Sequence, residues 1–164
     1  MGFLHCIIYL LSTQILLFFT GRLFPRKWLK PNSFPFRAYK CEKGGRIYEK
    51  IHIQKWKTKL PDASVILNKI IPGIMPKKRL DVKTRDKMQL LVKESCIAEA
   101  NHAFAALTGF VCVRIWRKTG GWIVAVANFV IHVPFVLIQR YNRPRLQKMV
   151  AKMDKVATQK DAVA

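Results

Sequence analysis

The segment from Lys93 to Trp116, KESCIAEANHAFAALTGFVCVRIW, decides the fold of this 164-residue chain. Its apolar run has the length of a membrane-crossing helix, which needs about 20 residues. Glu99 and His102 nevertheless lie inside it, close to its basic-flanked end. An ionisable residue at membrane depth costs about 2.5 to 3.5 kcal/mol and persists mainly where it pairs or performs chemistry. The segment therefore predicts a membrane span that carries a functional site.

Two further apolar runs lie on either side of this helix, and basic segments fill the spaces between them. The three predicted spans cover residues 3–20, 97–116 and 121–139. Hydrophobic residues make up 51% of the chain although its formal net charge is +21. This segregation predicts an all-α membrane protein, a single membrane domain over residues 1–164 with about three transmembrane helices and with amphipathic or interfacial segments on the cytoplasmic side. Nucleic-acid binding is the common explanation of so much positive charge, but it does not explain runs of membrane length, so we expect no nucleic-acid partner.

The distribution of cations predicts the orientation in the lipid bilayer. Residues 21–96 form a basic connector with 20 Lys and Arg, the predicted amphipathic tail 140–164 carries 7, and the short turn after the second span carries 3. Since cytoplasmic loops collect Lys and Arg, we expect a multi-pass protein of the cell membrane with its N-terminus outside and its C-terminus in the cytoplasm. The cations of the turn then lie outside, which conflicts mildly with that rule. A hairpin over residues 97–139 that crosses only part of the bilayer stays open as a second topology.

Local patterns refine the three helices. Thr84 is placed to cap a long helix that continues into the second span. Pro134 is expected to kink the third span. His102 shares a helical face with small residues, and Asn128 and His132 share a face of the third span, so these two faces are expected to pack together. The tail beyond the third span is expected to form an amphipathic helix that rests on the membrane.

Glu99 and His102 are the predicted catalytic residues. They lie three positions apart on one helix, so the carboxylate can orient the imidazole, which can then remove a proton from a hydroxyl that attacks an ester or thioester carbonyl. His132 and Asn128 are predicted to line the same site. Two alternatives stay open: the polar residues only hold helices together, or Glu99, His102 and His132 bind a metal ion. No metal is expected, because three ligands at this spacing match no recognised motif.

A basic segment follows the third span and is predicted to bind phosphate or carboxylate. Arginine forms bidentate bonds with such groups, and Pro144 would stiffen the turn that presents them. The predicted ligands are Arg140, Asn142, Arg143 and Arg145. In the connector, aromatic and aliphatic residues alternate with lysines, as in a segment that lies in the headgroup plane. Trp56, Lys57 and Lys59 belong to this part and are predicted to bind substrate. Asp62 follows as either a helix N-cap or a further substrate-binding residue.

Three motifs carry a resemblance to a known family: KWKTKLPD at 55–62, AEANH at 98–102 and VPFVLIQRYNRPRL at 133–146. In this order, within a small membrane chain, they resemble the glycosyl-4,4'-diaponeurosporenoate acyltransferases. That family esterifies the 6-hydroxyl of a glucosyl carotenoid with a fatty acid in the staphyloxanthin pathway of Gram-positive bacteria. The resemblance extends from about Tyr39 to Leu146, and QRYNRPRL is its most specific part.

The resemblance implies a membrane acyltransferase with a glycosyl carotenoid as acceptor. An acyl-CoA or acyl-carrier thioester would be the acyl donor, and no cofactor is implied. The family's pattern has the same residue types at the positions of Trp56, Lys57, Lys59, Asp62, Glu99 and His102. The position of His132 holds Asn in a relative, which favours His102 as the base. A non-catalytic small membrane protein and an acyltransferase of another glycolipid stay open as alternatives.

Overall fold

The structure, a computed structural model, describes residues 1–60, 69, 84–117 and 119–161. Every regular element within these residues is a helix. The long helices are α1 (Gly2–Leu23), α4 (Arg85–Thr108) and α6 (Thr119–Asp161), and the short elements are η1 (Arg26–Trp28), η2 (Lys40–Glu49), α2 (Ile53–Trp56), η3 (Gly109–Val111) and α5 (Cys112–Ile115). η3 and α5 prolong α4, and a short turn then leads into α6.

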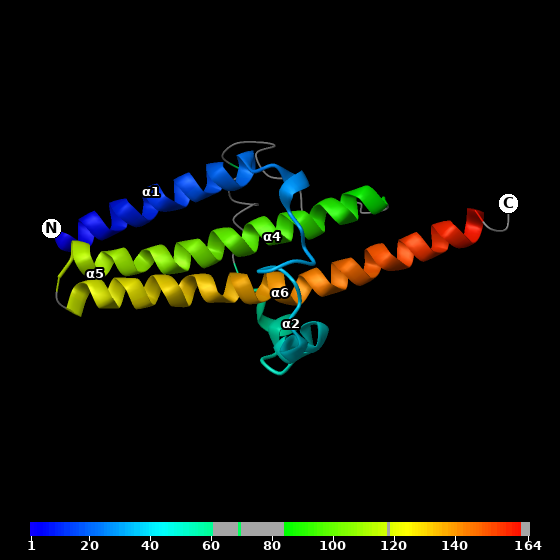
Figure 1. Cartoon of the computed structure of the whole chain (residues 1–164). Coiled ribbons are helices and arrows are strands. Elements are labelled where there is room, and N and C mark those ends of the chain that lie inside the picture. The colour runs from blue at the N-terminus through cyan, green and yellow to red at the C-terminus, as the bar shows by residue number, and fades with distance from the viewer. Residues whose placement is uncertain (61–68, 70–83, 118, 162–164) are drawn as a thin grey trace.

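Three helices lie side by side and are long and apolar enough to cross a membrane (Figure 1). The candidate spans are Gly2–Leu23, Arg85–Ile115 and Thr119–Gln159. α1 leaves large apolar side chains such as Leu11 and Leu16 exposed, as expected of a helix whose outer face meets lipid. The prediction of an all-α, multi-pass membrane protein is therefore confirmed.

α4 and α6 pack through the two faces predicted from the sequence. The side-chain N–H of Asn128 donates to the carbonyl of Ala105 at 2.7 Å, and Gly109 leaves the space that this amide occupies. Ala105, Ala106 and Ala125 are nearly fully buried. Small side chains let two helix backbones approach closely, and hydrogen bonds between the helices add to their attraction. The predicted pairing of the small and polar faces is confirmed.

The predicted start of the second long helix is confirmed, because Thr84 is the N-cap of α4. α6 runs without interruption through Pro134 and Pro144, so the turn predicted around Pro144 is wrong, and the predicted third span and tail belong to one helix. A proline removes one hydrogen bond of a helix, but neighbouring groups can satisfy the carbonyl that it releases. Figure 1 shows α6 changing direction along its length, as prolines inside helices commonly cause.

The C-terminal half of α6 packs against the first turns of α4. Leu146 and Val150 contact Met88 and Val92 in a small apolar cluster. Part of the apolar face of the predicted tail is thus covered by α4, and its contact with the membrane surface stays a prediction. An apolar stripe predicts which face of a helix is buried but not what it packs against. Here it packs in part against another helix of the chain.

The segment after α1 crosses to the same pair of helices. Leu29 and the partly buried Phe36 pack with Cys96 and Ile97 of α4. η2 and α2 then lie beside the middle of α6 (Figure 1). This path brings residues 35–57 to the level at which α4 and α6 carry their polar side chains.

Gly121 of α6 lies very close to the backbone of α5, and a substitution there tests this contact. A Cβ added at Gly121 would lie 2.6 Å from the carbonyl oxygen of Cys112 and 2.8 Å from Cα of Val113. Alanine favours a helix over glycine by about 1 kcal/mol, but here backbone atoms would have to move, at a cost of about 1 to 3 kcal/mol. We expect Gly121→Ala to lower the thermal midpoint of the detergent-solubilised protein. Ala127→Val, at an exposed position of the same helix, is the control and should change it little; a raised midpoint in Gly121→Ala would contradict the close approach.

Candidate active site

Glu99 lies at the centre of the polar contacts between α4 and α6. It is 6% exposed, and one carboxylate oxygen accepts a hydrogen bond from Nε of Arg140 at 2.8 Å while the other accepts from Arg143. The sequence predicted that Glu99 orients His102, but the structure pairs both oxygens with arginines of α6. A buried charge without such partners would be strongly unfavourable. Glu99 therefore fixes α6 against α4.

Arg143 is buried between α4 and the segment before η2. Only 2% of it is exposed. Nε donates to Oγ of Ser95 at 2.9 Å, one terminal nitrogen donates to the carbonyl of Phe36 at 2.7 Å, and the other donates to the carbonyl of Ser95 at 3.1 Å and to Glu99. A guanidinium has five N–H donors in a fixed fork, and these partners occupy most of them. The phosphate contact predicted for Arg143 has no geometric basis in this arrangement.

Arg140 joins the same carboxylate to η2. Its terminal nitrogens donate to Glu42 and to the carbonyl of Pro35, each at 2.7 Å. Glu42 also accepts from the hydroxyl of Tyr48 at 2.5 Å and from the backbone N–H of Tyr39 at 2.8 Å. Burial alone would raise the pKa of Glu42, but the hydrogen bonds from Tyr48, Arg140 and the Tyr39 backbone hold that pKa below its ordinary value. Glu42 is therefore ionised at neutral pH and holds η2 on α6.

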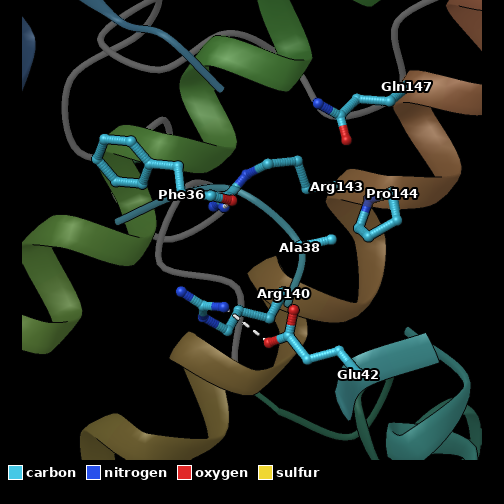
Figure 2. Close-up of a pocket in the computed structure, with 7 residues that line it drawn as sticks. All are labelled: Phe36, Ala38, Glu42, Arg140, Arg143, Pro144 and Gln147. Atoms are coloured by element: carbon cyan, nitrogen blue, oxygen red, sulfur yellow. Dashed lines mark hydrogen bonds and ion pairs between the residues drawn. The ribbon is translucent and has the colours of Figure 1, made fainter. Parts of the chain in front are cut away.

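Figure 2 shows a pocket lined in part by these groups. The lining residues are Phe36, Ala38, Glu42, Arg140, Arg143, Pro144 and Gln147. The side chains of Arg140 and Glu42 point toward each other there, joined by their ion pair. The pocket is too small to admit a water molecule. Arg140 and Arg143 thus meet carboxylates of the chain itself, and their cluster is not an open anion site.

A second polar group includes the predicted base. Nδ1 of His102 lies 3.1 Å from Nδ1 of His132, and Nε2 of His132 lies 3.0 Å from the side-chain amide nitrogen of Gln14. The ring of His102 stacks on Phe135, with the ring centroids 4.6 Å apart. Gln14, His102 and His132 are all half-buried. The structure brings His102 and His132 together as predicted and adds Gln14 of α1.

A cationic surface lies where α2 approaches α6. Lys57 and Arg145 both lie over the ring of Tyr141, with Nζ 4.8 Å and Cζ 3.5 Å from its centroid. Lys57 also donates to Oδ1 of Asn142 at 3.4 Å, and Arg145 pairs with Glu49. Burial lowers the pKa of Lys57, and the neighbouring charge of Arg145 lowers it further. Glu49 compensates one of these two positive charges, so the group keeps a net positive charge beside Tyr141.

The other predicted ligands have different positions. The indole N–H of Trp56 donates to the carbonyl of Ile51 at 2.9 Å, and Lys59 is exposed. Asn128 is hydrogen-bonded to a backbone carbonyl of α4, so the structure gives it a packing role in place of a ligand contact. Asp62 lies outside the described residues.

The described part of the chain contains no group of three or more His, Cys, Asp and Glu side chains that could hold a metal ion. Glu99, His102 and His132 therefore do not form such a group in the described residues. The carboxylate of Glu99 instead pairs with arginines.

Sequence reasoning missed Glu42 and Gln14. Glu42 had a usable signal, because the chain contains 9 acidic residues against 30 Lys and Arg, so each acid is a strong candidate for an ion pair. Gln14 had none. It is one of several polar residues of α1, which also contains Ser12 and Thr13, and only the packing of α1 shows that Gln14 is the one that contacts His132.

Comparisons with known proteins cover the ion pairs of Glu99 and both histidines, His102 and His132. A family profile described as Glycosyl-4,4'-diaponeurosporenoate acyltransferase matches residues 25–152. A protein of that name from Staphylococcus aureus (strain MRSA252) is 28% identical over 150 residues, which cover 88% of this chain and 86% of the relative. Proteins of the same name from strains N315 and USA300 are 27% identical over the same shares. No solved structure matches the chain.

Glu99→Gln tests the buried ion-pair network. The amide keeps the shape of the side chain but removes the charge that compensates Arg140 and Arg143. Removing one partner of a buried ion pair costs about 3 to 5 kcal/mol, so we expect a large fall in the thermal midpoint of the solubilised protein. Arg85→Gln is the control, because its pair with Asp154 is exposed and such pairs contribute about 0 to 1 kcal/mol. Equally small effects of the two changes would contradict the central place of Glu99.

Proposed function

This chain belongs to the glycosyl-4,4'-diaponeurosporenoate acyltransferase family, and we propose on that basis that it transfers a fatty acyl group to the sugar 6-hydroxyl of a glycosylated carotenoid. The family profile and the named relatives confirm the resemblance drawn from the three sequence motifs. The observation that carries the proposal in this chain is the position of His102. It places a half-buried imidazole at the contact of two apolar helices, where a lipid acceptor can reach it.

His102 is the proposed general base. Its imidazole, which contacts His132 through Nδ1, takes the proton of the sugar hydroxyl in this proposal. The hydroxyl oxygen attacks the carbonyl carbon of an acyl thioester, the new C–O ester bond forms, and the C–S bond breaks. The proton then passes from His102 to the departing thiolate, so that atoms and charge balance. A positioned base of this kind accelerates a reaction by about 10² to 10⁴-fold.

Glu99, Arg140 and Arg143 have a supporting role in this proposal. Their ion pairs lie about one helical turn from His102 and fix α6 against α4. This contact sets the distance between His102 and His132. Small errors in the position of catalytic groups lower rates strongly, by about 10²-fold for a displacement of 1 Å. The network therefore contributes to catalysis through geometry.

The depth of the histidines suits a membrane-embedded acceptor. Gln14, their neighbour on α1, lies nine residues before the end of that helix, which is about 13 Å along its axis. The polyene of the acceptor would lie among the lipid-facing side chains, with its sugar at the level of His102. The N-terminus lies outside the cell membrane and the C-terminus in the cytoplasm, as the concentration of cations in residues 21–96 supports.

The cationic surface at Tyr141 is the proposed site for phosphate groups of the acyl donor. Acyl-CoA and acyl-carrier thioesters both carry phosphate, and either would meet Lys57 and Arg145 there. The sequence predicts such contacts for Arg140, Asn142, Arg143, Arg145 and lysines of the connector, and the proposal keeps Lys57 and Arg145 but not Arg140 and Arg143. Those two side chains are engaged with carboxylates and carbonyls of the chain.

A non-catalytic role is the main alternative. The hydrogen bonds among Gln14, His132 and His102 join three helices, and polar side chains commonly hold membrane helices together in this way. An acyltransferase that acts on another glycolipid is a second alternative, because the same base would serve any primary sugar hydroxyl.

His102→Ala tests the assignment of the base. We expect the rate of formation of the acyl ester from glycosyl carotenoid and acyl-CoA to fall about a hundredfold or more in proteoliposomes, as measured by chromatography of the extracted pigment. His5→Ala changes an exposed histidine of α1 and is the control. Full conversion by His102→Ala would show that this residue is not the base. Unchanged turnover per folded molecule together with a lower thermal midpoint would support the non-catalytic role.

Lys57→Met tests the donor site against a matched lysine. Loss of a charge that binds phosphate should raise the donor concentration needed for half-maximal rate several-fold, with little change in the saturated rate. Lys59→Met, two positions further along the same segment, removes an exposed lysine and should leave the donor dependence unchanged. Equal responses of the two variants would contradict donor binding at Tyr141.

A further inference from the structure

We propose that a pocket between the first turns of α4 and the C-terminal half of α6 binds the headgroup of an anionic phospholipid that carries hydroxyl groups, as phosphatidylglycerol does. The pocket has a volume of about 340 Å³, which is within the range of about 300 to 1,000 Å³ for ligand sites. Its polar lining consists of Asn32, Gln89, Lys93, Gln147 and Asp154. The proposal does not depend on the proposed acyl transfer.

The pocket lies at the depth of the lipid headgroups. A Cβ added at Gly21, two residues before the end of α1, would lie 3.0 Å from Cγ2 of Ile97, so the end of α1 is level with Ile97 of α4. Lys93 and Gln89 lie four and eight residues before Ile97, which is about 6 and 12 Å along the helix axis. Each headgroup layer of a bilayer is about 5 to 8 Å thick. α4 and α6 continue past the end of α1 (Figure 1), so the pocket falls within this layer.

Aromatic side chains mark the same level. Trp28 is 65% exposed, and its ring packs edge-on against Phe24 with the centroids 6.0 Å apart. Exposed tryptophan is typical of the boundary between hydrocarbon and water. Trp28 lies three residues before Pro31, which lines the pocket. A phospholipid can therefore place its headgroup in the pocket while its acyl chains stay in the hydrocarbon layer.

Lys93 gives the wall of the pocket a positive charge. The acid next to it in sequence, Glu94, pairs with Arg26 at 2.8 Å. The acid in the same lining, Asp154, accepts from two nitrogens of Arg85. Because arginines compensate both carboxylates, neither neutralises Lys93. The lining thus favours a ligand with one negative charge, such as a phosphodiester, and Asp154 is not available to an ammonium group.

The side-chain amides of the lining suit the hydroxyl groups of such a headgroup. Nε2 of Gln147 donates to Oδ1 of Asn32 at 2.7 Å. This bond uses the oxygen of Asn32 and the nitrogen of Gln147, so Asn32 can still donate and Gln147 can still accept. Gln89 is exposed on α4 and offers both functions. A phosphate oxygen needs donors and a hydroxyl group uses one of each, so a phosphoglycerol group matches this set.

The pocket is separate from both parts of the proposed acyl-transfer site. Lys93 lies nine residues before His102 on α4, about 14 Å along the axis. On α6, Gln147 and Asp154 lie about 160° and 180° around the helix from Arg145, at 100° per residue. The pocket and the cationic surface at Tyr141 are therefore on opposite sides of α6.

A lipid titration tests the charge of the site. The protein in a neutral detergent is titrated with short-chain phosphatidylglycerol, and binding is measured by isothermal titration calorimetry. We expect one saturable site per chain, with phosphatidylcholine of the same acyl chains binding at least tenfold more weakly. Lys93→Gln should weaken the binding of phosphatidylglycerol about fivefold, as expected for one lysine beside an anionic headgroup. Lys87→Gln removes an exposed lysine of α4 outside the lining and should change it less than twofold. Equal binding of the two lipids would overturn the proposal.

A substitution that fills the pocket tests its position without changing a charge. Ala151 lines the pocket from an exposed position of α6, so Ala151→Trp adds bulk there without disturbing the core. We expect it to weaken the binding of phosphatidylglycerol at least tenfold, whereas Ala157→Trp, at an exposed position of α6 outside the lining, should leave it unchanged. Full binding by Ala151→Trp would overturn the proposal. Water-soluble glycerol 3-phosphate is the last comparison, because binding as tight as that of the lipid would show a site for soluble phosphate esters and would also overturn it.

Discussion

The burial of Glu99 constrains the rest of this structure. A carboxylate on a helix at membrane depth needs compensating charge, and α6 supplies it from Arg140 and Arg143, one turn apart. Two ion pairs to one carboxylate fix how far α6 slides along α4 and which face it presents. The remaining donors of the two arginines bind Phe36 and Glu42, so the same interaction also places the segment that follows α1. The contact between the two histidines depends on this register.

The specificity of the QRYNRPRL motif has a structural explanation in this chain. It is the most distinctive part of the resemblance to the family, and arginine beside the membrane suggests an anion site. Two of its arginines instead bind carboxylates and carbonyls inside the protein. The third, Arg145, is more exposed and binds Glu49 and the carbonyl of Tyr141. A distinctive motif can thus reflect the requirements of a fold as well as those of a ligand.

The helices and their contacting faces could be predicted from the sequence. The length of an apolar run indicates a membrane helix, and the spacing of small residues indicates the face that packs. The sequence was insufficient for the partners of Glu99. Local spacing favours His102 three residues away, but a carboxylate prefers permanent cations, and these come from another helix some 40 residues later. The turn predicted at Pro144 was wrong for a similar reason. A proline favours a turn when only local sequence is considered, but here it is accommodated inside a packed helix. The position of Gln14 opposite His132 depends on how α1 docks, which no local pattern encodes.

The continuity of α6 has a consequence for substrate length. His132, beside the proposed base, and Arg145, on the cationic surface, belong to one unbroken helix and lie 13 residues apart. At 1.5 Å per residue this is about 20 Å. Under the proposed function, a donor that contacts both positions needs about this distance between its phosphate and its thioester carbon. A shorter molecule with the same reactive group would lose one of the two contacts.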